Sequence, residues 1–221
     1  MLEVDDEDMA NAGAAAMEAT MLGKNVPVAW RVSPDRRAAL AEMIAASGLE
    51  SATLDGLQTW AVATSLSVAE IMRGYGAEGQ AATGVEEALA EAFRARARPI
   101  SGVETTAQQL GFFSRLPQPA QRAMLEEMID AYAAGEGGFD PGEDQWVQGN
   151  LDAMAAEMEA MAPELFDVLI TRRNAAWTDW LIARLDRPGT VLFAVGAGHL
   201  AGRDSVQSML AARGYTVTRV D

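Results

Sequence analysis

The stretch Thr190-Val191-Leu192-Phe193-Ala194-Val195-Gly196-Ala197-Gly198-His199 decides the predicted fold of this 221-residue chain. Residues 190–195 form an uncharged, largely apolar run, which is typical of a strand buried in a parallel sheet. The two glycines that follow allow a tight turn, and a histidine comes directly after them. Because ligands of open α/β sheets bind at the carboxyl ends of strands, His199 becomes the first candidate functional residue.

Strand patterns also occur at both ends of the chain, in segments 1–4 and 215–220, and near its middle, in segment 98–104. The residues between them have helical periodicity, and most of the predicted helices are bounded by caps or glycines. We therefore predict an α/β fold with a mainly parallel central sheet formed by both chain ends. We expect a single domain over residues 1–221, with a large helical insertion over about residues 6–95 and 105–185.

Charge and composition exclude several classes of function. The chain has 17 Lys+Arg against 32 Asp+Glu, a net charge of −15, whereas a nucleic-acid-binding protein needs a basic surface. It has no cysteine, which excludes disulfides, thiolate metal sites and cysteine nucleophiles. No apolar run approaches the roughly 18 residues of a membrane span. With one histidine, any metal site of this chain must depend mainly on carboxylates.

Two glutamates have the same setting as His199, at the end of a predicted strand. Glu104 ends the segment Ile100-Ser101-Gly102-Val103-Glu104, and Glu3 lies in Leu2-Glu3-Val4. If they converge with His199 above one sheet, two carboxylates and an imidazole would suit Mn, Co or Zn. The alternatives are that each glutamate stabilises a helix N-terminus and that His199 is a structural residue of the turn.

Two further features could bind a ligand. Gly196 and Gly198 allow the backbone to approach a cofactor closely, although the pattern lacks the third glycine of a dinucleotide site and the Walker lysine. Arg173, inside a long predicted helix, could clamp a carboxylate or an oxyanion, or it could form a surface salt bridge. Trp177 and Trp180 are expected to pack in the core or in a groove.

Short motifs occur in a fixed order along the chain: Leu2-Glu3-Val4-Asp5, Gly84-Val85-Glu86, Gly102-Val103-Glu104-Thr105, Arg173-Asn174-Ala175-Ala176-Trp177, and residues 195–202 followed by Gly214-Tyr215. Together they resemble the TraB/GumN family, which includes the Tiki-like metalloproteases. The resemblance implies a metal-dependent hydrolase acting on a peptide or small molecule. It implies that His199, Glu3 and Glu104 hold or orient a divalent metal and that Glu86 is a further ligand or supports the ligands. It also implies that Arg173 stabilises the developing oxyanion or orients a carboxylate. His199, Glu104 and Arg173 are then the expected catalytic residues.

The sequence departs from the family pattern at its beginning. The pattern opens with a strand that ends in a further Gly-x-x-His, whereas His199 is the only histidine here. We therefore expect that the chain lacks this first strand and that its metal site is incomplete. The alternative function is a catalytically inactive protein of the same fold that binds a peptide or small molecule. The acidic N-terminus has no signal-peptide pattern, but the expected truncation would remove one, so the sequence predicts neither compartment nor oligomeric state.

Overall fold

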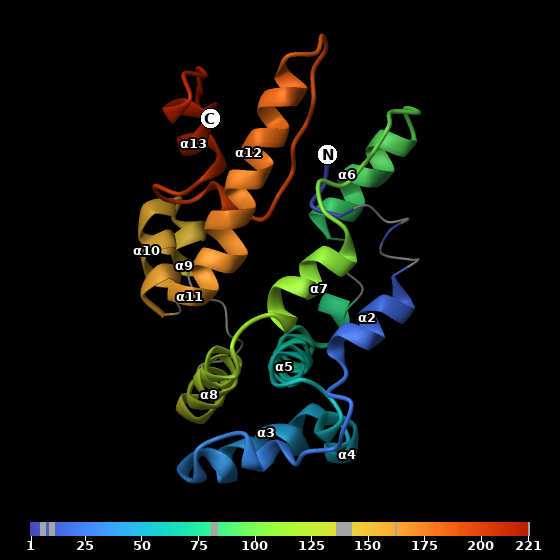
Figure 1. Ribbon diagram of the computed structural model, residues 1–221, viewed down its shortest axis with the longest axis vertical. Helices are drawn as coiled ribbons and strands as arrows, with labels where there is room; N and C mark the ends of the chain where they lie inside the picture. The colour runs from blue at the N-terminus through green and yellow to red at the C-terminus, as the bar shows by residue number, and fades with distance from the viewer. Residues whose placement is uncertain (5–7, 9–11, 81–83, 136–142, 162, 221) are drawn as a thin grey trace. The chain divides into compact units, whose positions relative to one another are not determined.

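A computed structural model of the chain describes residues 1–4, 8, 12–80, 84–135, 143–161 and 163–220. Most of these residues are helical (Figure 1). They divide into two compact units. The first unit combines Met1–Asp6, Leu89–Thr105 and Asp140–Asp221, and the second combines Glu7–Ala88 and Thr106–Phe139. No helix among the described residues is both long enough and apolar enough to cross a membrane.

The second unit is a helical assembly. Its α-helices are α2 (Gly13–Thr20), α3 (Arg37–Ser47), α4 (Ser51–Asp55), α5 (Thr59–Gln80), α7 (Thr106–Ser114) and α8 (Gln118–Ala134), and its 3₁₀ turns are η1 (Val28–Trp30) and η2 (Pro34–Arg36). Helices α3, α5 and α8 pack against one another. They bury an apolar core that includes Leu40, Met43, Val62, Leu66, Leu125 and Ile129. Burial of this apolar surface is the main favourable term for the unit.

A buried glutamine joins α5 to α8. The amide oxygen of Gln121 accepts a hydrogen bond from the backbone N–H of Trp60 at 3.2 Å, and its amide nitrogen donates to the Leu116 carbonyl at 2.9 Å. The first N–H groups of a helix have no partner within that helix. Gln121 therefore satisfies one such group of α5 in an interior where an unpaired N–H would be costly.

The first unit contains α9 (Glu143–Val147), α10 (Leu151–Met161), α11 (Pro163–Phe166), the π-helical turn η3 (Asp167–Thr171), α12 (Arg172–Leu185), the 3₁₀ turn η4 (Ala197–Leu200) and α13 (Val206–Ala212). Helix α6 (Val85–Arg94) begins in the second unit and ends in the first. Elements α11, η3 and α12 follow one another without a break, so they form one long helix with a widened turn. Turns of this kind are frequent at functional sites.

The prediction of an α/β fold with a central parallel sheet is wrong. The described residues contain no strand, and the segments predicted as strands are extended or irregular. Leu2 and Gly102 form an isolated parallel bridge, and the Ala194 N–H donates to the Met1 carbonyl at 2.9 Å. Segment 216–220 is exposed.

Local bends explain why these contacts do not extend into a sheet. The chain bends at residues 3–4 and 103–104, and the N–H groups of Val103 and Glu104 both donate to the Glu3 carbonyl. The hydrogen bonds of a parallel ladder are evenly spaced. Here two neighbouring N–H groups share one carbonyl, so the parallel pairing ends after Leu2 and Gly102. The run at 190–195 is also only partly buried, and Leu192 is exposed.

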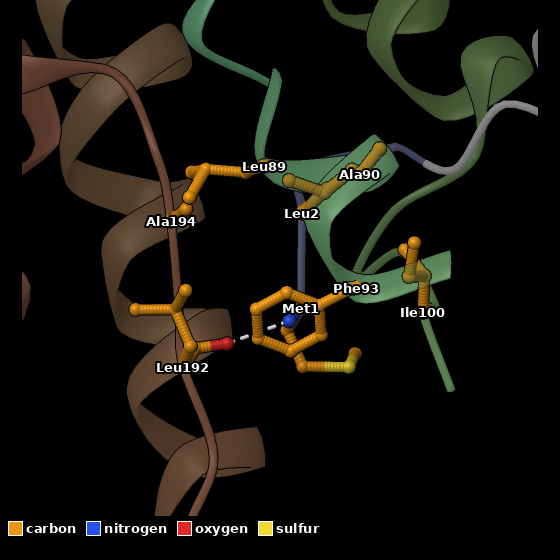
Figure 2. Close-up of a pocket in the computed structure, with 8 residues that line it drawn as sticks. All are labelled: Met1, Leu2, Leu89, Ala90, Phe93, Ile100, Leu192 and Ala194. Atoms are coloured by element: carbon orange, nitrogen blue, oxygen red, sulfur yellow. Dashed lines mark hydrogen bonds between the residues drawn. The ribbon is translucent and has the colours of Figure 1, made fainter. Parts of the chain in front are cut away.

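The extended segments border a small apolar pocket instead. Figure 2 shows its lining: Met1, Leu2, Ile100, Leu192 and Ala194 from the extended segments and Leu89, Ala90 and Phe93 from α6. The Met1 ammonium donates to the Leu192 carbonyl at 2.6 Å. The apolar side chains of the extended segments thus face helix α6. This helix covers them, as a packed layer covers the apolar face of a sheet.

Gly202 generates a stability prediction, because a side chain there would be both strained and crowded. Its φ is +71°, and a Cβ would lie 2.6 Å from the Ala155 Cβ of α10. We expect Gly202→Ala to lower the free energy of unfolding by about 3 kcal/mol, measured by chemical denaturation. Gly149 has a φ of +73° and no heavy atom within 4 Å of the added Cβ, so Gly149→Ala should cost only about 1 kcal/mol. Equal losses in the two variants would contradict the packing argument.

Candidate functional site

Four of the predicted site residues meet in the first unit. Glu3 and Glu104 come from the bends that end two extended segments, Arg173 from the first turn of α12 and His199 from η4. The Arg173 guanidinium is the common partner. Its Nη2 donates to Glu3 Oε2 at 2.7 Å and to Glu104 Oε2 at 2.8 Å. Its Nη1 lies 3.2 Å from His199 Nε2. We call Glu3, Glu104, Arg173 and His199 the arginine cluster.

Arg173 uses its whole hydrogen-bonding capacity within the protein. Besides the three contacts above, its Nε donates to both oxygens of Glu104 at 3.0 and 3.1 Å. Its Nη1 also donates to the Leu169 carbonyl, in the π-helical turn η3, at 3.1 Å. An arginine has five N–H donors, and each has a protein acceptor here. An oxyanion could bind Arg173 only if one of these bonds were exchanged.

A tryptophan completes the surroundings of the arginine cluster. Trp177 Nε1 donates to Glu104 Oε1 at 3.0 Å, so this carboxylate accepts bonds from two residues of α12. The Trp177 ring lies 4.4 Å from the His199 ring, centroid to centroid, and 4.7 Å from the Arg173 guanidinium carbon. Trp177 therefore packs in the core, as the sequence predicts, and also contacts the candidate site.

Asn174 holds the opposite side of the histidine. Its Oδ1 lies 2.7 Å from His199 Nδ1, and its Nδ2 donates to the carbonyls of His199 and Asp204 at 3.2 and 2.7 Å. Asn174 has no exposed surface. His199 thus has a polar partner at each ring nitrogen, although it is itself buried.

The spacing of residues along α12 explains how one helix supplies so much of the site. Its buried residues are Arg173, Asn174, Trp177, Thr178 and Leu181. Residues at intervals of three or four lie on one helix face, and this face carries polar side chains at its beginning and apolar ones at its end. The first turn therefore reaches the carboxylates and His199 while the later turns pack in the core.

The glycines before His199 serve two different purposes. The Gly196 N–H donates to Glu3 Oε1 at 3.0 Å. A Cβ on Gly198 would lie 3.2 Å from Met158 Cε and 3.6 Å from Ile170 Cδ1. Gly198 is thus required by the packing of α10 and η3 around the turn. Gly196 contributes a backbone donor to the arginine cluster, and cofactor binding at the two glycines stays a prediction.

Burial and charge perturb the pKa values of the arginine cluster. Burial lowers the pKa of His199 to about 4; the nearby Glu3 carboxylate opposes this effect, and Arg173 adds to it. Burial alone would raise the pKa of Glu3, but the Gly196 N–H and the positive charge of Arg173 outweigh it and leave the pKa lowered. Burial would lower the pKa of Arg173, but its bonds and charge interactions with Glu104 and Glu3 raise it. At neutral pH the structure therefore holds a neutral imidazole beside an ionised Glu3 and a charged guanidinium.

This donor set does not fit a divalent metal. Glu3, Glu104 and His199 all face Arg173, and a guanidinium has no lone pair to offer a metal. Glu86 is exposed in the first turn of α6, where an acidic side chain stabilises the helix N-terminus, and it is not part of the arginine cluster. Within the described part of the chain, no three His, Asp or Glu side chains are grouped to hold a metal ion.

Comparisons with known proteins agree with the ordered motifs. A family model described as the TraB/PrgY/GumN family matches residues 1–219. The chain belongs to this family. The TraB/GumN resemblance of the sequence is thus confirmed.

Two proteins that are similar to the chain differ in how much of it they match. It is 35% identical over 68 residues to a protein of Amphimedon queenslandica named metalloprotease TIKI homolog, a match covering 30% of this chain and 13% of that protein. It is 25% identical over 215 residues to the uncharacterized protein YbaP of Escherichia coli K12, covering 90% of this chain and 77% of that protein. No solved structure matches the chain.

Sequence reasoning from single residues missed the roles of Asn174 and Trp177 in this family member. The stretch Arg173-Asn174-Ala175-Ala176-Trp177 contained the signal. Once residue 173 faces the site, residues 174 and 177 lie on nearly the same face of the helix. A polar residue beside a large aromatic one on that face indicates a buried polar site rather than a purely apolar core.

Removing the buried guanidinium should destabilise the protein strongly. Arg173→Met leaves Glu104 and Glu3 without their cationic partner, and we expect a loss of about 3–5 kcal/mol in the free energy of unfolding, measured in urea. The matched control is Arg203→Met, because Arg203 pairs with Glu159 at 2.7 Å but its side chain is 76% exposed. The control should cost less than about 1 kcal/mol. Similar losses in the two variants would show that Arg173 is not the main support of the arginine cluster.

The low pKa of His199 predicts a loss of stability in mild acid. Its pKa is about 4 in the folded chain, against an ordinary value of 6.5, so only the unfolded state binds this proton between those values. Stability should therefore fall as the pH falls through this window, by about 2 kcal/mol between pH 7 and pH 5. Below about pH 4.5 the protonation of Glu3 adds to this loss of stability, because its pKa is lower in the folded state than in the unfolded state. Urea unfolding of the wild type and of His199→Gln at pH 7 and pH 5 measures this loss. An equal change in the free energy of unfolding between the two pH values in both proteins would contradict the prediction.

Proposed function

We propose that this chain is a hydrolase of the TraB/GumN type that acts on peptides, with the arginine cluster as its reaction centre. The choice of peptides is supported by the similarity to a protein named metalloprotease TIKI homolog. The observation that carries the proposal is the meeting of two carboxylates, a neutral imidazole and a guanidinium, drawn from segments far apart in sequence. These are the groups that move protons and stabilise negative charge in hydrolysis.

Exposure of the side chains indicates where substrate and water enter. The Glu3 side chain is 27% exposed, whereas those of Arg173, Glu104 and His199 are 9%, 8% and 6% exposed. Glu3 Oε1 lies 3.8 Å from His199 Nε2. The accessible side of the arginine cluster is therefore the side that carries Glu3. The attacking water would bind on that side, next to Glu3 Oε1 and to the Nε2 atom that Arg173 releases.

Each residue then has a role that follows from its surroundings. Glu3, ionised at neutral pH, takes a proton from the water as its oxygen attacks the peptide carbonyl carbon. It returns this proton to the amine as the C–N bond breaks. Glu104 is bonded to Arg173 and Trp177, so it fixes the guanidinium. The longest Arg173 contact, 3.2 Å to His199 Nε2, goes to a neutral acceptor and is the weakest of the set. In the proposed reaction, Nη1 therefore breaks its bond to His199 Nε2 and donates to the oxyanion instead.

The metal implied by the resemblance to metalloproteases has no step in this proposal. The sequence-predicted ligands Glu3, Glu104 and His199 direct their acceptor atoms to Arg173. A divalent ion at this place would have to displace the guanidinium and break each of these bonds. The proposed reaction relies on the positive charge of Arg173 for the electrostatic stabilisation that a metal supplies elsewhere.

The second candidate function is a binding protein without catalysis, acting on a peptide or a small molecule. The observation that favours it is the saturation of Arg173, whose N–H groups all have protein acceptors. On this view the arginine cluster only holds the extended segments to α12. A ligand would bind elsewhere, and the chain would hydrolyse no peptide.

Glu3→Gln tests the proposed catalysis. The substitution keeps the size, and its one amide oxygen can keep the bond to Arg173. It gives up the bond from the Gly196 N–H and removes the proton acceptor, so peptide hydrolysis should fall about 100-fold or more. Hydrolysis of a quenched fluorescent peptide mixture by the purified chain measures the rate. The same rate is expected in the presence and absence of EDTA, because no step uses a metal.

The matched control is Glu157→Gln, an exposed glutamate of α10 that bonds to Gln145 at 3.2 Å. It should leave the rate unchanged. Hydrolysis that survives Glu3→Gln would overturn the assignment of Glu3. A folded wild-type chain that cleaves none of the peptides would favour the binding protein. Activity lost in EDTA and restored by Mn, Co or Zn would show that a metal displaces Arg173 in the working enzyme.

A further inference from the structure

The orientation of the Asn174 side chain is determined by its surroundings. Its Nδ2 faces two backbone carbonyls, those of His199 at 3.2 Å and Asp204 at 2.7 Å. Carbonyl oxygens only accept hydrogen bonds, so the amide nitrogen must be on that side. The amide oxygen is therefore the atom that lies 2.7 Å from His199 Nδ1, and it can only accept.

The two neighbours of the imidazole require the same tautomer. An amide oxygen at Nδ1 requires a proton on Nδ1. Arg173 Nη1, a group that only donates, lies 3.2 Å from Nε2, so Nε2 must offer its lone pair. The other tautomer would place two donors against each other at Nε2 and two acceptors at Nδ1, inside a buried site where unpaired groups are costly.

Asn174 is rigidly held, as a residue that orients another must be. It has no exposed surface. Thr178 Oγ1, one helical turn away, donates to the backbone carbonyl oxygen of Asn174 at 2.7 Å. Trp177 packs against the imidazole on the same helix face. The rotation of the His199 ring is thus limited by Asn174 through hydrogen bonding and by Trp177 through contact.

We propose that Asn174 is a positioning residue that holds His199 as the Nδ1–H tautomer, so that Nε2 presents a bare lone pair to the arginine cluster. The catalytic importance of this tautomer rests on the proposed function. In that function Nε2 accepts a bond from Arg173 at rest and from the attacking water after the exchange. Asn174 contacts neither Glu3 nor the reacting atoms, so it acts through His199. Its role parallels that of the partners that fix the tautomer of functional histidines in general.

The single histidine of this chain makes the proposal directly measurable. Protein labelled with ¹⁵N-histidine contains one imidazole, so its two ring nitrogens are assigned without ambiguity by NMR. We expect the wild type at neutral pH to show a one-bond N–H signal at Nδ1 and a non-protonated Nε2. In Asn174→Ala the Nδ1–H proton should exchange with water about 10-fold faster, because its buried acceptor is gone. Peptide hydrolysis by this variant should fall about 10- to 100-fold.

The matched control is Gln121→Ala, which also removes a fully buried amide but in the second unit. It should leave both histidine signals at their wild-type positions even if it lowers stability. A wild-type spectrum with the proton on Nε2, or a mixture of tautomers, would overturn the proposal without any variant. So would an Nδ1–H exchange rate in Asn174→Ala equal to that of the wild type.

The two readouts separate this inference from the proposed function. An Nδ1–H tautomer that depends on Asn174, in a chain that cleaves no peptide, supports Asn174 as the positioning residue and rejects the hydrolase. Peptide cleavage by a chain whose histidine is protonated on Nε2 supports the hydrolase and rejects the role of Asn174.

Discussion

The charge of Arg173 is the constraint on which the first unit depends. A guanidinium that is almost fully buried costs several kcal/mol unless it is paired and hydrogen-bonded. Glu104 and Glu3 supply that pairing, and both come from bends that end extended segments. The ion pairs therefore join the N-terminal residues and the segment before α7 (Thr106–Ser114) to helix α12. This arrangement has a consequence for chemistry, because a cation that must be neutralised gathers the acidic and basic groups that a hydrolytic site needs.

The surroundings of His199 follow from the same helix. Once α12 presents Arg173 to the carboxylates, Asn174 and Trp177 are carried to the histidine by helical spacing alone. Gly196 and Gly198 then allow η4 to approach closely, one by donating to Glu3 and the other by leaving room for Met158. Helix α12 thus carries Arg173, Asn174 and Trp177, and a helix positions side chains more precisely than a loop can. Burial is the main cause of the low pKa of His199, and the charge of Arg173 adds to it.

Reasoning from the sequence succeeded where local chemistry decides and failed where pairing over long distances decides. His199, Glu3, Glu104 and Arg173 were singled out as candidates, and the structure brings these four together; their catalytic roles stay predictions. Glu86 is not part of the group. The prediction of a parallel sheet was wrong because an apolar run such as 190–195 is compatible both with a strand and with an extended segment packed on a helix. The bend at Glu3 stops the pairing, and such a bend depends on tertiary contacts that periodicity does not describe.

The sequence by itself determined the membership in the TraB/GumN family, the acidic character, the absence of thiol chemistry and the reliance on one histidine. These are properties of residue identity and order. Only the tertiary structure decided that Arg173 lies at the centre of the carboxylates and that Asn174 faces His199 Nδ1. It also decided that the extended segments pair only briefly and that their apolar side chains face α6 (Val85–Arg94). The physical reason is that a buried charge and a buried imidazole must find partners, and which residues become those partners depends on how segments far apart in the chain are brought together.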